Sequence, residues 1–199
     1  SEMCIRDRAT VLLAKPIRRW LLLLGKYLGV VLFVAGIAAM FVGLTWLSLG
    51  IKTGIWTGAY WLAVPLLAVN FAVFYSVSLF LAVWTRNPAV CTFGTVLFWF
   101  LCWGMNFAHH GALANPPPNA GAGGLFLMDV GYWLLPKPLD LSGIFFDAIE
   151  AEGFAGKVPE LANVQKAGQF HGELSVLASL AFATVAVGLA AYELEMTDY

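Results

Sequence analysis

The chain has 199 residues, of which 60% are hydrophobic and 12% are charged, whereas an average soluble domain carries about 25% charged residues. The formal net charge is −1, but the first 128 residues hold eight basic and two acidic residues, and the last 71 hold three basic and ten acidic. This composition excludes a soluble enzyme, a nucleic-acid-binding domain and a disulfide-stapled secreted module.

Long apolar stretches dominate the sequence. Four of them contain no Asp, Glu, Lys or Arg: 27–51, 53–85, 87–128 and 174–192. A helix needs about 20 residues to cross a hydrocarbon core of roughly 30 Å, and each stretch reaches about that length. Because the backbone in lipid must satisfy its own hydrogen bonds, the sequence predicts an all-α, polytopic helical membrane protein with four transmembrane helices.

The amino-terminal segment differs in kind from the spans. Residues 1–8, SEMCIRDR, resemble a translated sequencing adapter and are interpreted as an assembly artefact, so the natural sequence is expected to start near Ala9. Residues 9–26 place basic side chains among apolar ones, and Pro16 disfavours helix at Lys15. One interpretation is an amphipathic helix that starts at Pro16 and lies on the membrane surface, and the other is a basic flank that anchors the next span. Both place the segment in the cytosol, because short loops rich in Lys and Arg stay inside.

Residues 27–107 are expected to form three transmembrane helices. Their expected bounds are about 27–50, 59–84 and 89–107. Residues 51–57 are predicted to be a short external turn. The sequence Thr-Arg-Asn-Pro at 85–88 is predicted to be a tight cytosolic turn, since it combines turn residues with one positive charge.

The second span contains a proline and three polar side chains. Pro65 removes a backbone hydrogen bond and is expected to kink the helix. Asn70, Ser76 and Ser78 are interpreted either as hydrogen-bonding contacts to a neighbouring helix or as the lining of a translocation path.

Candidate catalytic and metal-binding residues are scarce. His109 and His110 are adjacent, so on a helix their side chains point about 100° apart and do not chelate one ion as a pair four residues apart would. His171 stands alone, and Cys91 and Cys102 are expected to be small buried hydrophobes. The predicted spans hold no carboxylate, and the chain has no GxxxxGK(S/T) phosphate loop. We therefore expect no catalytic residue, no metal site and no cofactor.

Residues 108–172 are predicted to be a long external region. NPPPNAGAGG at 115–124 is interpreted as a flexible linker that cannot hold a helix, and the apolar run after it is too interrupted to span. Ser142 is predicted to cap one short amphipathic helix, and Pro159 to open a second that extends through about Phe170. These interfacial or re-entrant helices are expected to pack over the outer mouth of the bundle.

Residues 173–199 are expected to hold the last transmembrane helix, at 174–192, and a short tail. Four crossings that start in the cytosol return the tail to the cytosol. The acidic residues of the tail do not oppose this, because acidic side chains contribute little to orientation. The expected location is the inner (cytoplasmic) membrane of the cell, as a multi-pass protein.

The segment LLAKPIRRWLLLLGKYLG at 12–29 resembles the stretch that follows the second membrane helix in type-2 ABC transporter permeases. In that family a (K/R)-P-(I/V)-x-R run followed by G-K-x-x-G enters the third helix. The matching residues here are Lys15, Pro16, Ile17, Arg19, Gly25, Lys26 and Gly29. Three weaker features agree: the turn at 85–88, the YWLLPKPLDL run at 132–141, and a chain end at Asp198-Tyr199. The resemblance covers essentially residues 9–199.

The resemblance implies a membrane permease subunit of an ATP-binding cassette exporter, whose translocation path is driven by a separate ATPase subunit. The implied partners are that ATPase, a second permease copy or a sister permease, and the lipid bilayer, with no nucleic acid. ATP hydrolysis is expected on the partner, so the chain itself is not expected to be an enzyme. The residues expected to couple to the ATPase are Lys15, Pro16, Ile17, Arg18, Arg19, Trp20, Gly25 and Lys26. The external residues 125–170 are expected to gate the outer mouth, and Gly25 and Gly29 to allow close helix packing.

Two features depart from the family pattern. Family members have six spans, so the resemblance implies that this chain is a carboxyl-terminal fragment without the first two helices. The sequence Glu-Met-Thr stands before the terminal Asp-Tyr, where family members often carry a basic residue.

Two other function classes compete with a permease. The alternative is an ATP-independent membrane channel or scaffold subunit whose external loop binds a partner, and it predicts no ATP-binding subunit encoded next to the chain. A membrane enzyme that uses His109, His110 or His171 at the outer surface would lose activity when they are substituted.

Overall fold

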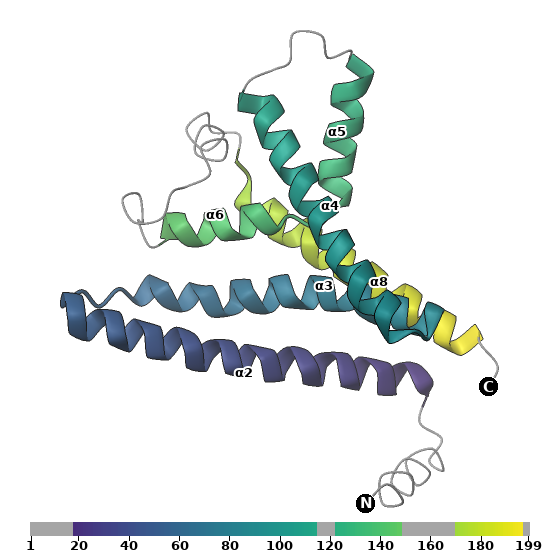
Figure 1. The fold of residues 1–199 in the computed structure, drawn as a ribbon, viewed down its shortest axis with the longest axis horizontal. Helices are drawn as coiled ribbons and strands as arrows, with labels where there is room; N and C mark the ends of the chain where they lie inside the picture. The colour runs from purple at the N-terminus through teal and green to yellow at the C-terminus, as the bar shows by residue number, and fades with distance from the viewer. Residues whose placement is uncertain (1–17, 115–121, 149–169, 197–199) are drawn as a thin grey trace, which may run out of the picture.

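The computed structural model describes residues 18–114, 122–148 and 170–196, and every regular element in these ranges is a helix (Figure 1). Four helices are long and apolar enough to cross a membrane, by their length and composition. They are Arg19–Thr53, Gly58–Thr85, Pro88–Leu113 and Gly172–Met196. The prediction of an all-α, polytopic helical protein with four such helices is confirmed.

Helix α2 runs without interruption from Arg19 to Thr53. The sequence from Trp20 to Leu24 consists of helix-forming residues with no proline or glycine, so nothing separates the basic residues from the span. A surface helix that stops before residue 27 is therefore not formed, and the described part of the segment is a basic flank continuous with α2. Its 35 residues extend over about 52 Å, more than a hydrocarbon core of about 30 Å.

The turn after α2 begins three residues later than predicted. Gly54 adopts φ 73° and its N–H donates to the carbonyl of Gly50 at 2.9 Å, a left-handed cap that favours glycine. A 3₁₀ helix, η1 (Gly58–Leu62), leads directly into α3 (Ala63–Thr85). Pro65 is the third residue of α3, in the first turn, where a missing N–H is tolerated. In place of the expected kink within a span, the helix changes from 3₁₀ to α at Ala63, two residues before the proline.

The predicted tight turn at 85–88 is confirmed. Helix α3 ends at Thr85, Arg86 takes the left-handed conformation with φ 52°, and α4 (Pro88–Ala114) follows. The side-chain oxygen of Asn87 accepts a hydrogen bond of 3.0 Å from the N–H of Ala89, in the first turn of α4. Helix α4 continues seven residues beyond the predicted end at 107, so both of its histidines lie on the helix.

Two short helices precede the last span. Helix α5 (Ala122–Leu134) begins inside the predicted linker, and its 13 residues extend only about 20 Å, too short to cross a membrane. Helix α6 (Pro138–Ala148) starts at a proline. Proline is suited to this position, because an N–H group there would find no acceptor within the helix. Ser142 is therefore not the cap that the sequence predicts. Its hydroxyl donates to the carbonyl of Leu139 at 2.7 Å, inside the helix. Residues 115–121 and the helix expected from Pro159 lie outside the described residues.

Helix α3 is central, since it packs against α2, α4, α6 and α8 (Gly172–Met196). Helices α2 and α3 lie side by side and antiparallel, while α4 runs obliquely away from α3 and packs against α5 (Figure 1). The buried residues of α8 are all small and recur every three or four positions: Ser175, Ser179, Ala183, Ala186 and Ala190. Such spacing lets helices approach closely in lipid.

The outward faces of the long helices are apolar. Leu32 and Phe33 on α2 and Phe93 on α4 are each 68–70% exposed. A contiguous apolar surface of this kind is unfavourable in water and favourable against lipid chains. The arrangement is that of a multi-pass membrane protein.

Candidate functional site

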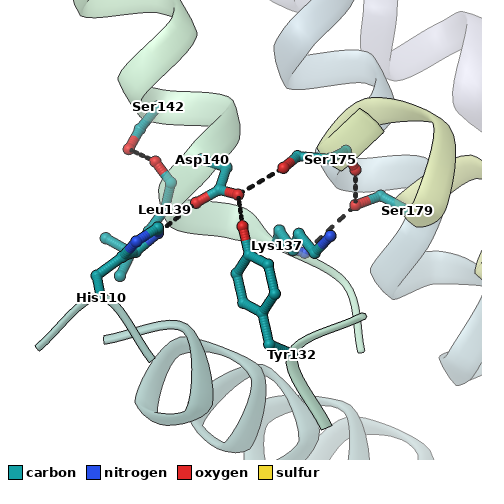
Figure 2. A network of polar contacts seen from close by, with 8 residues as sticks. All are labelled: His110, Tyr132, Lys137, Leu139, Asp140, Ser142, Ser175 and Ser179. Atoms are coloured by element: carbon teal, nitrogen blue, oxygen red, sulfur yellow. Dashed lines mark hydrogen bonds and ion pairs between the residues drawn. The ribbon is translucent and has the colours of Figure 1, made fainter. Parts of the chain in front are cut away.

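A buried carboxylate lies where four helices meet. Asp140, in the first turn of α6, is fully buried and accepts three hydrogen bonds (Figure 2). His110 Nε2 of α4 lies 2.7 Å from Oδ1, the Tyr132 hydroxyl of α5 lies 2.6 Å from Oδ2, and the Ser175 hydroxyl of α8 also lies 2.6 Å from Oδ2. We call these four residues the Asp140 junction. One side chain thereby joins α4, α5, α6 and α8.

The local sequence explains how Asp140 is placed. The Leu-Pro-Lys-Pro sequence at 135–138 ends α5 and opens α6, because Pro138 fits the first position of a helix. Asp140 then falls in the first turn, where the helix dipole favours a negative charge. The carboxylate is stabilised there before any tertiary contact is formed.

The electrostatics of the junction favour an ionised aspartate. Burial raises the pKa of Asp140, but hydrogen bonds from His110, Ser175 and Tyr132 lower it more, so that the pKa lies below its usual value. Burial and the nearby negative charge of Asp140 raise the pKa of Tyr132, which keeps its hydroxyl protonated as a donor. Since a carboxylate only accepts hydrogen bonds, the His110 nitrogen that faces it carries a hydrogen.

A buried lysine lies beside the junction. Lys137 is 1% exposed, and its Nζ has no hydrogen-bond partner within the described part of the chain. The ammonium lies 3.6 Å from the centre of the Trp133 ring and 4.2 Å from that of Tyr132, an arrangement that attracts a cation to the ring faces. Burial lowers the pKa of Lys137 to about 8, although Asp140 acts in the opposite direction. The backbone N–H of Lys137 donates to the Ser179 hydroxyl at 3.3 Å.

A small pocket adjoins the junction. It encloses about 180 Å³ and is lined by all three histidines of the chain together with Asp129 and the Tyr132 and Trp133 rings. His109 stacks on Tyr132 with ring centres 3.8 Å apart, and its Nε2 lies 3.3 Å from a carboxylate oxygen of Asp129. His109 and His110 thus face two different carboxylates. Among the described residues, no group of three or more His, Cys, Asp or Glu side chains could hold a metal ion.

Serine, histidine and aspartate meet here, but not as a hydrolytic triad. In a triad the histidine lies between the serine and the aspartate and accepts the serine proton. Here both His110 and Ser175 donate to Asp140, and Ser175 is 1% exposed. The geometry holds helices together and does not activate a nucleophile.

The structure separates the residues of the predicted translocation path. Ser76 is fully buried and donates to the carbonyl of Val73 at 2.6 Å in its own helix, so its hydroxyl does not bond to a neighbouring helix. Asn70 lines a groove of about 510 Å³ between α2, α3 and α4 and a cavity of about 170 Å³ between α3 and α6. The side-chain oxygen of Asn70 is buried without a partner among the described residues. Neither cavity is lined by Ser76 or Ser78.

The described coupling residues lie at the start of α2, away from α5 and α6, which carry part of the Asp140 junction (Figure 1). Lys15, Pro16 and Ile17 are outside the described residues. Arg18, Arg19 and Lys26 are exposed at the start of α2, and Trp20 is half-buried. A Cβ atom added at Gly25 or Gly29 would meet nothing within 4 Å, so the described chain makes no close packing there.

Sequence reasoning missed the Asp140 junction, although a signal was present. Lys137 and Asp140 are two opposite charges three residues apart in an otherwise apolar run, a placement that is costly unless the charges are partnered. The prolines and glycines of this run indicated only that it is too interrupted to span the membrane. Cys91 and Cys102 are free and buried, as predicted.

Comparisons of the chain with protein-family models, with curated proteins and with solved structures found no match. Two features of the described chain remain as candidate functional sites. One is the exposed basic start of α2, and the other is the buried polar junction between α4, α5, α6 and α8.

Proposed function

We propose that the chain is the membrane permease subunit of an ATP-binding cassette transporter, and that a separate ATPase subunit drives its translocation path. The observation that carries the proposal is the exposed basic start of α2, with Arg18, Arg19 and Lys26, on a membrane-length helix. These residues belong to the Lys-Pro-Ile-Arg-Arg and Gly-Lys run that resembles the cytosolic coupling segment of type-2 permeases.

An uninterrupted helix is suited to transmit force from an ATPase. Helix α2 continues for 35 residues from the basic flank to its glycine cap. It is tied to α3 near its start, where the Tyr27 hydroxyl donates to the carbonyl of Ala72 at 2.8 Å and the Tyr27 ring stacks on Tyr75. A push on the flank would therefore displace α2 and α3 together.

Charge placement supports a cytosolic position for this end. Arg86, in the α3–α4 turn, and the carboxyl end of α8 lie at the same end as the basic flank (Figure 1). Positive residues in short loops favour the cytosolic side of the inner membrane. The open surface beside Gly25 and Gly29 is available for a second permease copy or a sister permease, since small residues permit close approach in lipid.

The test is association with a candidate ATP-binding subunit of the same cell. The two are co-expressed, and the amount of ATPase retained on the purified membrane chain is measured. The double variant Arg18→Glu, Arg19→Glu is expected to lose most of the bound ATPase, because like charges replace the proposed contact. The matched control is Lys52→Glu, at the other end of the same helix, which should retain the ATPase.

Two outcomes would contradict the proposal. Equal retention by the double variant and by Lys52→Glu would show that the flank is not the docking surface. Failure of the wild-type chain to bind any ATP-binding subunit would favour an ATP-independent channel or scaffold subunit instead.

A further inference from the structure

The Asp140 junction contains more ionisable groups than helix packing requires. Buried charges are costly to desolvate, and inside membrane proteins they mark functional sites. Asp140 is fully buried, His110 is 2% exposed and Lys137 is 1% exposed. Nothing in the proposed coupling to an ATPase uses any of them.

We propose that the Asp140 junction is a proton-binding site, in which Nδ1 of His110 takes up a proton from water and the resulting ion pair tightens the hold of α6 on α4. One O–H bond of a hydronium ion breaks, the N–H bond at Nδ1 forms, and a neutral water molecule is left.

The state of the His110 ring identifies the atom that is free to react. Nε2 already carries the hydrogen that is donated to Asp140, so in the neutral ring Nδ1 bears a lone pair. Nδ1 is buried and has no hydrogen-bond partner within the described ranges. A proton at Nδ1 makes the ring positive, so the 2.7 Å contact with the ionised Asp140 becomes an ion pair as well as a hydrogen bond.

A pocket lies beside the His110 ring. The pocket of about 180 Å³ that His110 lines has room for several water molecules at about 30 Å³ each. Asp129, at the pocket, has a carboxylate that is 61% exposed and lies 3.3 Å from His109. Solvent protons can therefore reach the pocket through an exposed acid and a second imidazole.

The charged and titratable groups around the site come from every element that packs there. Helix α4 contributes His109, α5 contributes Asp129 and Tyr132, and the start of α8 contributes His171, which lines the pocket. The α5–α6 connection contributes Lys137 and α6 contributes Asp140. Two carboxylates, Asp140 and Asp129, and one buried ammonium, Lys137, thus lie around His110.

Proton uptake would act on a cavity wall. Helix α6 lines the cavity of about 170 Å³ that also contains Asn70, through Pro138, Leu141 and Phe145. A stronger contact between α6 and α4 restrains this wall. Protonation of His110 at low pH would thus reduce the mobility of helix α6, which forms one wall of that cavity. This effect does not require the ATPase.

The first test observes the His110 ring directly. The full chain is labelled with ¹⁵N-histidine and placed in lipid nanodiscs, and the His110 signals are identified by their loss in His110→Gln. From about pH 8 to about pH 5.5, where histidines commonly titrate, the ring should pass from the single Nε2–H form to the doubly protonated form. In Asp140→Asn the doubly protonated fraction at the acidic end should fall several-fold, whereas Asp147→Asn, on the exposed side of the same helix, should behave as wild type.

The second test does not depend on a variant of Asp140. Hydrogen-exchange protection of the α6 amides, corrected for intrinsic exchange, should increase from about pH 8 to about pH 5.5 in wild type and in the control Asp147→Asn, but not in His110→Gln. A His110 ring that stays singly protonated across this range would overturn the proposal. So would an equal increase in protection in His110→Gln. Neither result would bear on binding of the ATPase.

Discussion

The Ser175 hydroxyl donates a 2.6 Å hydrogen bond to Oδ2 of Asp140, which lies 35 positions earlier in the chain. The bond joins the first turn of α8 to the first turn of α6, and the same oxygen accepts the hydroxyl of Tyr132 from α5. Lipid chains are as apolar as leucine, so apolar contact alone gives helices in a membrane little reason to associate. Polar contacts of this kind therefore decide where the short helices lie.

Removing the Asp140 carboxylate should destabilise the fold strongly. In Asp140→Ala three buried donors lose a charged acceptor, and each hydrogen bond to a charged group contributes about 1.5–3 kcal/mol. The free energy of unfolding in detergent measures the effect. Asp147→Ala is the control, since Asp147 is an exposed residue of the same helix and its loss should cost less than about 1 kcal/mol. Similar losses in the two variants would show that the junction does not hold α6.

The contribution of Ser175 should depend on Asp140. Ser175→Ala alone is expected to cost about 1.5–3 kcal/mol, the range for a hydrogen bond to a charged group. In the background of Asp140→Ala the same change should cost much less, because its acceptor is already gone. A double-mutant cycle on the unfolding free energy gives this coupling, and additive effects would contradict the contact.

Stability should rise with pH on the alkaline side because of Lys137. Its pKa of about 8 in the folded chain lies below the ordinary 10.5, so between these values the unfolded chain binds more protons than the folded chain. The free energy of unfolding should consequently increase from pH 8 to pH 10.5, by up to about 3 kcal/mol for a shift of this size. Lys137→Met, which keeps an unbranched apolar side chain, should lack this component of the increase. If the unfolding free energy of Lys137→Met depended on pH as that of wild type does, the Lys137 ammonium would be exposed to water and not buried.

The spans were predictable because their signal is local. A charge-free stretch of sufficient length specifies a membrane helix, and the turn at 85–88 is specified by Asn87 and Pro88 themselves. The boundaries were less predictable: α4 continues to Ala114 and α2 to Thr53, although polar residues such as His109 and Lys52 lie past the expected ends. Helix α5 also begins at Ala122 despite Gly123 and Gly124, because packing against α4 outweighs a glycine cost of about 1 kcal/mol each.

The candidate site was not predictable because its partners are distant in sequence. His110 and Asp140 are separated by 30 positions, and Asp140 and Ser175 by 35. Only the packing of α4, α6 and α8 brings them together, and no periodicity within one segment encodes it. The prediction for Ser142 failed within a single segment. Serine is a favourable N-capping residue, but the helix begins four residues earlier, at Pro138.

Gly54 should be intolerant of a side chain. Its φ of 73° is unfavourable for other residues, so Gly54→Ala is expected to cost about 1 kcal/mol of unfolding free energy. Gly104, in the interior of α4, is a matched control, since a Cβ atom there meets nothing within 4 Å. Gly104→Ala should be neutral or stabilising by up to about 1 kcal/mol. Destabilisation of the same size at both positions would exclude a conformational cause at Gly54.

The hydroxyl of Tyr27 should contribute measurably to the pairing of α2 with α3. It donates a buried 2.8 Å hydrogen bond to the carbonyl of Ala72, so Tyr27→Phe removes one bond and keeps the ring that stacks on Tyr75. The expected loss is about 1 kcal/mol of unfolding free energy. Tyr60→Phe is the control, because the hydrogen bond from its hydroxyl to Thr45 is longer, at 3.2 Å, and exposed.

If the permease proposal is right, Tyr27→Phe should also reduce the movement of α3 that follows ATPase binding, as measured by the distance between spin labels on α3 and α4. Unchanged stability together with unchanged movement would show that α2 transmits its displacement through packing alone.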